Sequence, residues 1–251
     1  MATVGRPGDF SQQASAYVRA RPGYPPGFVS TLVDGVRLHP GATIAEFGAG
    51  TGLFTQQLSG RGFEILAIDP TAAMRELAAP MADVRWLEGR FEDCPASVET
   101  VDWVVVAHAF HWADPQRALA EFHRISRPAG PLTVLWNVRD LDASALLRTT
   151  RALIDERVPG FDEGYHRREW GEVLTCTGHF GEVEYREVPN LISMSHARFL
   201  DLWRSHNKLT RACADVGGID NFVTALEQAL VDFPDPVEVP YRCRAWTARR
   251  T

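Results

Sequence analysis

The residues best suited to chemistry lie in a glycine-rich turn, Gly48-Ala49-Gly50-Thr51-Gly52, with an acidic residue, Glu46, two positions before it. An apolar run precedes the turn and a helical pattern follows it, so the stretch predicts a strand, a tight turn and the start of a helix. Glycines let the backbone approach a ligand closely, and the free N–H groups at a helix start attract negative groups. The turn alone therefore fits either an ordinary strand–helix connection or a cradle for a nucleotide-type cofactor.

The spacing of the turn distinguishes between possible cofactors. Its pattern is G-x-G-x-G, whereas dinucleotide-binding turns read G-x-G-x-x-G. The carboxylate of Glu46 would oppose a pyrophosphate but attract a cation or an amine, and S-adenosylmethionine carries both a sulfonium and an ammonium group. No Gly-Lys-Ser/Thr follows, which excludes a P-loop. Asp69 ends the next apolar run, at the spacing expected for a carboxylate that binds ribose hydroxyls; its alternative role is to start a helix.

The elements that must position these residues alternate along residues 43–137. Near-continuous apolar runs cover 44–47, 65–68, 84–87, 101–107 and 132–136, and helical patterns cover 53–58, 72–81 and 115–125. Such runs are typical of parallel strands covered on both faces by helices. In such a sheet, ligands bind beyond the carboxyl ends of the strands. The predicted fold is therefore α/β, with 46–52, 69–70, 90–92 and 107–112 meeting at one crevice.

Five ordered pieces carry a family resemblance: E46-F-G-A-G-T-G52, D69-P-T-A-A-M74, G89-R-F-E-D-C-P95, D102-W-V-V-V-A-H-A-F-H-W-A-D114 and E121-F-H-R-I-S-R-P-A-G130. V239-P-Y-R-C-R-A-W246 matches more weakly. The chain resembles the class I S-adenosylmethionine-dependent methyltransferases, and more narrowly the small-molecule branch that includes trans-aconitate methyltransferase-like enzymes. This resemblance implies methyl transfer to a small-molecule acceptor, such as a specialised metabolite.

The resemblance also implies an architecture. It is a doubly wound, Rossmann-like, mostly parallel seven-stranded sheet with an antiparallel C-terminal edge strand and a helical cap. Residues 1–40 would form an N-terminal helical lid. Residues 41–251 would form the methyltransferase domain with the cap inserted around 190–235, in one globular unit. From the patterns, we expect strands at 183–188 and 237–248, an irregular stretch at 189–195, and helices at 28–36, 143–158, 170–174, 196–214 and 219–231.

The cofactor site predicted by the resemblance centres on Asp69 at the ribose and on Glu46 at the amino end of the methionine. Arg21 would pair with the methionine carboxylate, and Tyr17 could face the sulfonium. Arginine cannot accept a hydrogen bond, so adenine recognition beside Arg90 must rest on backbone groups. The expected cofactor-binding residues are Tyr17, Arg21, Glu46, Phe47, Gly48, Ala49, Gly50, Gly52, Asp69, Pro70, Met74, Arg90, Phe91, Glu92, Ala107 and His108.

The catalytic candidates are His111 and then His108, because an imidazole can take a proton at neutral pH. The alternative is that this His-Trp pair packs or caps a helix. An acceptor that is not protonated needs no base at all, so the enzyme would then act by alignment and exclusion of water. Substrate contacts are expected from the lid, the cap and the end of the fifth strand, namely from Tyr24, Trp112, Trp136, Arg139, Trp203, His206 and Asn207.

Composition narrows the partners. The 251 residues carry a formal net charge of −6 and no long basic run, so a nucleic-acid substrate is not expected. Cys94, Cys176, Cys213 and Cys243 show no C-x-x-C spacing, which argues against structural zinc and suits a reducing compartment. No long apolar run predicts a signal peptide or a membrane span. We expect a cytoplasmic monomer or homodimer that needs no metal. The alternatives are an S-adenosylmethionine-binding protein without methyl transfer and a nicotinamide-dependent oxidoreductase.

Overall fold

The computed structural model describes residues 20–162 and 164–251. One seven-stranded sheet runs in the order β3-β2-β1-β4-β5-β7-β6. Its strands are β1 (Thr43–Phe47), β2 (Glu64–Ile68), β3 (Val84–Leu87), β4 (Trp103–Ala107), β5 (Pro131–Arg139), β6 (Phe180–Met194) and β7 (Val237–Arg250). The first five pair in parallel, while β7 pairs antiparallel with both β5 and β6. The predicted doubly wound sheet with an antiparallel C-terminal edge is confirmed.

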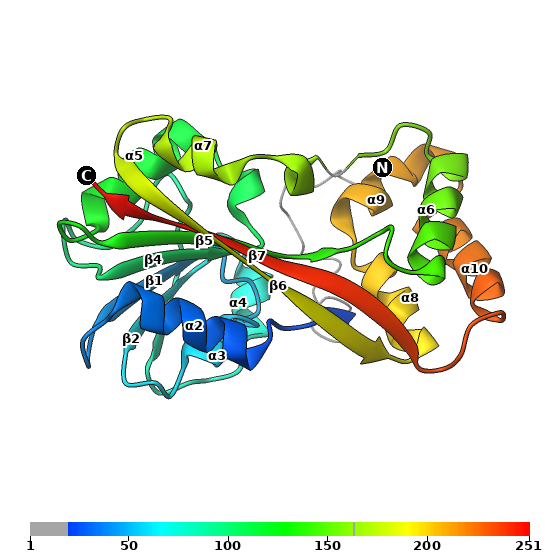
Figure 1. Ribbon diagram of the computed structural model, residues 1–251, viewed down its shortest axis with the longest axis horizontal. Helices are drawn as coiled ribbons and strands as arrows, with labels where there is room; N and C mark the ends of the chain where they lie inside the picture. Colours follow the sequence, from blue (N-terminus) through cyan, green and yellow to red (C-terminus); the bar gives the residue numbers. More distant parts are fainter. Residues whose placement is uncertain (1–19, 163) are drawn as a thin grey trace.

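Helices cover both faces of the sheet (Figure 1). On one face lie α2 (Pro26–Val36) and α3 (Thr55–Leu58), and on the other lie α5 (Pro115–Ile125) and α7 (Trp170–Thr175). The start of α5 follows from its sequence: the Asp114 side chain accepts from the backbone N–H groups of Gln116 and Arg117, and Pro115 occupies the first turn. A short helix, α4 (Ala72–Glu76), follows β2.

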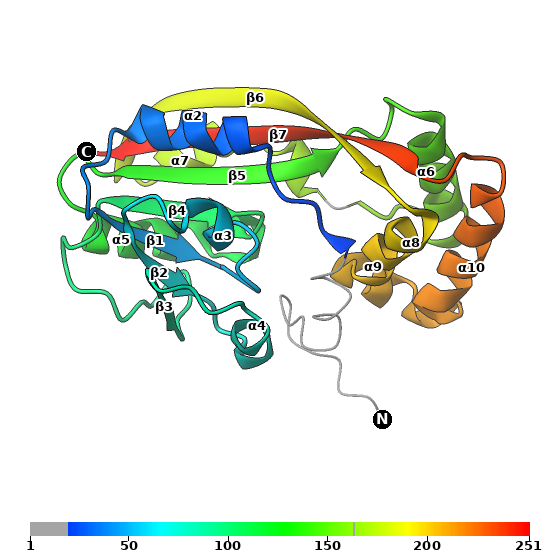
Figure 2. The ribbon, with the colours of Figure 1, turned by 90° about the horizontal axis from the view of Figure 1, so that it is seen from below.

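A third group of helices lies beyond the carboxyl end of β5 (Figure 2). It consists of α6 (Ala145–Arg157), α8 (His196–Arg204), α9 (Asn207–Ala212) and α10 (Gly218–Leu230), and we call it the helical cap. These helices share an apolar core with the ends of β6 and β7, through Met194, Val237, Val239 and Tyr241. The cap therefore stands over the edge of the sheet where ligands bind in folds of this type.

Three elements differ from expectation. The strand β6 extends over 15 residues and includes the stretch expected to be irregular; Pro189 is accommodated because β6 is the edge strand. The helix expected over 196–214 is two helices, because the Nδ1 atom of His206 accepts from the backbone N–H of Leu209, 3.2 Å away, and starts α9. The helix expected over 72–81 ends at Glu76, and Pro80 prevents the residue before it from continuing a helix.

The segment before α2 takes a different path from the helix itself. While α2 packs on the sheet through Phe28, Val29 and Leu32, residues 20–25 lead toward the cap. This segment is attached to the sheet by amide groups, because Asn137 and Asn190 both donate to the Gly23 carbonyl, at 3.2 and 3.3 Å. Within the described part of the chain, no helix is both long and apolar enough to span a membrane.

Candidate functional site

The glycine turn after β1 has a geometry that side chains would not tolerate. Gly48, Gly50 and Gly52 have φ values of 66°, 59° and 82°, in the left-handed region that favours glycine. A Cβ atom on Gly48 would lie 2.5 Å from the Cβ of Ala109, which follows β4. The Gly48 N–H donates to the Ile68 carbonyl at 2.8 Å. The turn is thus held between the ends of β1, β2 and β4.

Asp69 follows β2 and faces this turn. One carboxylate oxygen accepts from the Gly50 N–H at 2.9 Å and the other from the Thr71 N–H at 2.8 Å. Burial raises the pKa of Asp69, and these backbone hydrogen bonds oppose that rise. A carboxylate has about four acceptor positions, so each oxygen keeps the capacity to accept a further hydrogen bond from a ligand hydroxyl.

Glu46 is a buried carboxyl group at the other side of the turn, with 1% of its surface exposed. Its Oε2 accepts from the Thr55 hydroxyl at 2.7 Å. Burial raises the pKa of Glu46 to about 8; the hydrogen bond from Thr55 opposes this shift, and the charge of Asp69 adds to it. A buried carboxylate needs a compensating charge, and none of the described cations forms an ion pair with Glu46. The position therefore suits a cationic ligand group.

Three adjoining cavities, which share lining residues, lie at this edge of the sheet. Cavity A, of about 200 Å³, is lined by Arg21, Gly48, Gly50, Asp69, Pro70, Thr71, Met74, Arg90, Phe91, Glu92, Ala107, His108, Ala109, His111, Trp112, Tyr165, His206, Asn207 and Lys208. Cavity B, of about 50 Å³, adds Pro22, Tyr24, Glu46, Ala49, Leu53, Phe54, Asn137 and Tyr241. Cavity C, of about 40 Å³, adds Val138, Arg139, Leu141, Arg151, Ile154, Phe161, Asp162, His166 and Trp203. Arg21 and His108 line all three.

The structure thus brings most of the predicted site residues together. The ribose, adenine and histidine candidates meet in cavity A, Glu46 and Tyr24 meet in cavity B, and Arg139 and Trp203 meet in cavity C. Tyr17 lies outside the described residues, as do residues 1–19 of the predicted N-terminal lid.

Three predicted residues do not line these cavities. Phe47 is fully buried and packs on Phe122, with ring centroids 4.6 Å apart. A Cβ on Gly52 would face the Trp86 ring at 3.2 Å, so this glycine allows close packing. Trp136 points to the face of β5 that is covered by α7 and stacks on Trp170 at 4.3 Å. Alternation of side chains along the strand places Trp136 on the opposite face of β5 from Asn137, which lines cavities B and C.

The hydrogen bonds of His108 and His111 differ in a way that the sequence could not reveal. Trp136 Nε1, which can only donate, lies 3.3 Å from His111 Nδ1. In the neutral imidazole the proton then sits on Nε2, so His111 is oriented as a donor. His108, with φ of 56°, places its Nε2 3.5 Å from the Tyr165 hydroxyl. The Tyr165 ring also stacks on His111 at 4.3 Å.

Tyr165 and Lys208 are cavity residues that sequence reasoning missed. Tyr165 begins a short 3-10 turn, η2 (Tyr165–Arg167), outside any periodic pattern. Lys208 is the only lysine of the chain, and its Nζ lies 5.7 Å from the Trp112 ring centroid and 5.9 Å from that of Tyr165. The uniqueness of Lys208 was the one available signal.

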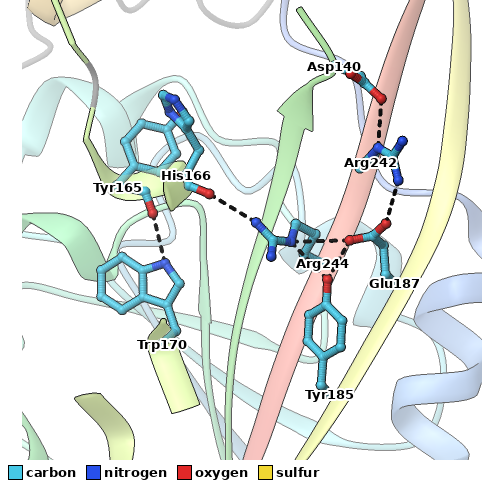
Figure 3. A network of polar contacts seen from close by, with 8 residues as sticks. All are labelled: Asp140, Tyr165, His166, Trp170, Tyr185, Glu187, Arg242 and Arg244. Atoms are coloured by element: carbon cyan, nitrogen blue, oxygen red, sulfur yellow. Dashed lines mark hydrogen bonds and ion pairs between the residues drawn. The ribbon is translucent and has the colours of Figure 1, made fainter. Parts of the chain in front are cut away.

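A polar network fixes the segment that carries Tyr165 (Figure 3). Arg242 on β7 pairs with Asp140 at 2.7 Å and with Glu187 on β6 at 2.9 Å. Arg244 pairs with the same Glu187 at 3.3 Å and donates to the His166 carbonyl at 2.9 Å. The antiparallel edge of the sheet thus positions one wall of cavity A.

The residues present fit S-adenosylmethionine. A carboxylate with spare acceptor capacity (Asp69) and a buried carboxyl group (Glu46) flank a turn that permits close approach of a ligand. Arg21 lines the same cavity as Glu46. The Tyr241 hydroxyl in cavity B is buried without a hydrogen-bond partner among the described residues, and a ligand carboxylate would supply one.

Comparison with known proteins agrees with this geometry. Residues 45–134 match the model of the methyltransferase domain family. An uncharacterized methyltransferase-like protein of Schizosaccharomyces pombe is 31% identical over 186 residues, which cover 72% of this chain and 70% of the relative. An uncharacterized methyltransferase of Mycobacterium tuberculosis is 39% identical over 132 residues, covering 52% of this chain and 53% of the relative. The aligned part thus spans about half the length of the mycobacterial relative.

Solved structures show the same fold. A candidate type II methyltransferase from Anaeromyxobacter dehalogenans superposes with a TM-score of 0.69 at 23% identity, over 91% of this chain and 97% of that one. A candidate methyltransferase from an antibiotic biosynthesis pathway of Anabaena variabilis gives a TM-score of 0.62 at 19% identity, over 90% and 98% of the chains. The narrower trans-aconitate-like branch stays a prediction. The chain belongs to the class I S-adenosylmethionine-dependent methyltransferases.

Proposed function

We propose that this protein transfers a methyl group from S-adenosylmethionine to a small-molecule acceptor. The observation that carries the proposal is the convergence of Asp69 and Glu46 on the Gly48–Gly50 turn. Two carboxyl groups at this turn match the ribose hydroxyls and the ammonium group of the cofactor. Arg21 would bind the methionine carboxylate, and Pro70, Met74 and Phe91 would enclose the adenine.

Bound S-adenosylmethionine supplies a methyl group on a positively charged sulfur. The methyl carbon would pass to the acceptor atom, and the cofactor's sulfur would keep the electron pair of the broken S–CH₃ bond. The protein has to align the acceptor with this bond and keep water away. Trp112, Tyr165 and the cap residues His206 and Asn207 line cavity A and would serve both purposes.

Where the acceptor atom starts protonated, a base must take the proton. The Trp136 donor leaves His111 with its proton on Nε2, so we assign His111 the donation of a hydrogen bond to the acceptor. His108 lines all three cavities beside Tyr165, and we assign it the role of base. This assignment reverses the order expected from the sequence.

The dimensions of the site support a small acceptor. Cavity A has a volume of about 200 Å³ and cavity C of about 40 Å³, and the cofactor would occupy part of cavity A. The helical cap stands over this space, and the net charge of −6 does not favour a nucleic-acid partner. The cytoplasmic location and the monomeric or dimeric state stay predictions from the sequence.

The test begins with calorimetric binding of S-adenosylhomocysteine. Asp69→Asn replaces charge-assisted hydrogen bonds, each worth about 1.5–3 kcal/mol, so the dissociation constant should rise at least about tenfold. Asp83→Asn is the matched control, because Asp83 also accepts from a glycine N–H, that of Gly60 at 2.7 Å, but lies away from the cavities. The control should change affinity less than about twofold.

Absence of binding to folded wild-type protein would overturn the cofactor assignment. Methyl transfer is then tested separately, with methyl-labelled S-adenosylmethionine and fractionated metabolite extracts. Label entering no metabolite, despite tight cofactor binding, would favour a binding protein without methyl transfer.

A further inference from the structure

Cavity C is separate from the expected positions of the adenosine and methionine groups. Its walls come from the end of β5, from α6 and α8, and from Phe161, Asp162, Tyr165 and His166. It adjoins cavity A, because Arg21, His108 and Tyr165 line both. At about 40 Å³, it exceeds the roughly 10–15 Å³ that a cavity needs to hold one water molecule. The space therefore suits one small polar group attached to a larger body in cavity A.

One wall of cavity C carries a buried hydrogen-bond donor. Trp203 is 1% exposed, and its indole nitrogen has no hydrogen-bond partner among the described residues. An indole N–H can only donate, and leaving a buried donor unsatisfied costs about 1–3 kcal/mol. A ligand that satisfies Trp203 must therefore present an acceptor atom.

Arg139 adds a guanidinium group that lies over the Trp203 ring. It ends β5, and its Cζ lies 4.2 Å from the centroid of the Trp203 ring. Stacking on an aromatic ring restricts the plane of the guanidinium, whose paired N–H groups match the two oxygens of a carboxylate. Trp203 and Arg139 thus both line cavity C, with the Arg139 guanidinium over the Trp203 ring.

The charges of the described lining agree with an anionic ligand. Arg21, Arg139 and Arg151 contribute guanidinium groups, and Asp162 is the one carboxylate among the described lining residues. Arg151 is paired with Asp155 at 3.0 Å, and the proposed function gives Arg21 to the methionine carboxylate, so Arg139 is the main cation for a further ligand. Asp162 is paired with Arg167 at 2.8 Å, which leaves its charge largely compensated. The described walls are therefore positive and rich in donors.

Resting on the proposed function, we propose that cavity C binds the carboxylate of the methyl acceptor, which is a small aromatic carboxylic acid. The carboxylate bonds to Arg139 and the Trp203 indole. The ring lies toward cavity A, where the Tyr165 and Trp112 rings form aromatic walls. Aromatic walls favour a planar apolar body. The carboxylate is then an anchor, and methylation occurs on the part of the acceptor that reaches cavity A.

The test uses protein labelled with ¹⁵N in its indole groups and saturated with S-adenosylhomocysteine. The Trp203 signal is assigned by its loss in Trp203→Phe. Benzoate should shift this signal, and its affinity should exceed that of the neutral isostere benzamide at least about tenfold, since each charge-assisted bond adds about 1.5–3 kcal/mol. Phenyl phosphate tests the alternative oxyanion and should bind more weakly than benzoate, because its head group is larger than a carboxylate.

Variants separate this site from the cofactor site. Arg139→Met and Arg139→Lys should each weaken benzoate binding, the first at least about tenfold, with S-adenosylhomocysteine affinity changed less than about twofold. Unchanged cofactor affinity also shows that the variants fold. Arg148→Met is the matched control: Arg148 lies on α6, is exposed, and donates to the Asp142 carbonyl rather than into the cavity.

The outcomes distinguish the two proposals. If the protein binds S-adenosylhomocysteine, three results would overturn the carboxylate site alone. These are an unmoved Trp203 signal, equal affinity for benzoate and benzamide, and unchanged benzoate binding by Arg139→Met. Tighter binding of phenyl phosphate than benzoate overturns the carboxylate assignment. Failure of the wild-type protein to bind S-adenosylhomocysteine overturns the proposed function and this inference with it.

Discussion

Glu46 should make cofactor binding depend on pH. In the free protein its carboxyl group is buried, and its pKa is raised to about 8, chiefly by that burial. An ammonium group binds the ionised form, so binding requires the proton to leave. Affinity for S-adenosylhomocysteine should therefore rise with pH up to about 7.5, which is the sign expected when the ligand favours the deprotonated state of the protein group.

The size of the effect follows from that pKa. A group with a pKa of about 8 is about 1% ionised near pH 6 and about 24% ionised near pH 7.5, so affinity should increase roughly 20-fold over this interval. We set the upper limit of the measurement at about pH 7.5, because the amino group of the ligand is still mostly protonated there.

Calorimetry at several pH values measures this directly. Glu46→Gln removes the titration but keeps an oxygen that can accept from Thr55, 2.7 Å from the native carboxylate. Its affinity should be weaker near pH 7.5 and nearly independent of pH. A wild-type affinity that is flat between about pH 6 and 7.5, or a slope that persists in Glu46→Gln, would refute the assignment of Glu46 to the ammonium group.

The same residue should affect folding stability with the opposite pH dependence. The raised pKa means that folded Glu46 keeps its proton between its ordinary pKa of 4.5 and about 8, while the unfolded chain releases it. The free protein should lose up to about 1.4 kcal/mol of stability per pH unit in this window through Glu46. Urea unfolding without cofactor should show a shallower pH dependence for Glu46→Gln, and parallel curves would contradict the burial argument.

Three further predictions concern the surroundings of the site. Gly48→Ala should lower the free energy of unfolding by more than the roughly 1–2 kcal/mol that a left-handed alanine costs, because its Cβ would lie 2.5 Å from a methyl group. Gly41→Ala, at φ of 77° with open space around it, should cost about 1–2 kcal/mol. Urea unfolding measures both, and equal costs would contradict the close approach at Gly48. Asp114→Ala removes the cap of α5 and should destabilise the protein by about 1 kcal/mol, and an unchanged urea midpoint would contradict this. Nitrogen NMR of the imidazoles above about pH 8 should show neutral His111 protonated on Nε2, because Trp136 donates to its Nδ1; protonation on Nδ1 would remove the reason for preferring His108 as the base.

The sheet and the turn were predictable because their signals are local. Apolar runs and the Gly48–Gly52 spacing define the parallel strands and the connection between β1 and α3. Asp114-Pro115 marked the start of α5 at the residue where it begins. The cap and β6 were less predictable. Their boundaries depend on a side chain that caps a helix, His206, and on pairing of β6 along β7.

The residues of the candidate site likewise fall into those that the sequence predicts and those that it does not. Asp69 and Glu46 could be proposed from their positions beside strand ends, since parallel strands must end at one edge of the sheet. Trp136, Gly52 and Phe47 could not be separated from cavity residues, because which face of an element looks outward depends on the layer packed against it. Tyr165 lies in the short turn η2 and Lys208 in α9 of the cap, and no sequence pattern encodes the distance of either element from β4.

The sequence by itself determined the fold class and the family, because glycine conformation, apolar patterning and carboxylate spacing act over a few residues. The tertiary structure alone decided that Glu46 is buried deeply enough to hold its proton. It also decided that His111 accepts from Trp136, and that Arg139 and Trp203 form one wall of a cavity. These properties arise from contacts between segments far apart in the chain, where burial and hydrogen bonding set the protonation and orientation of each group.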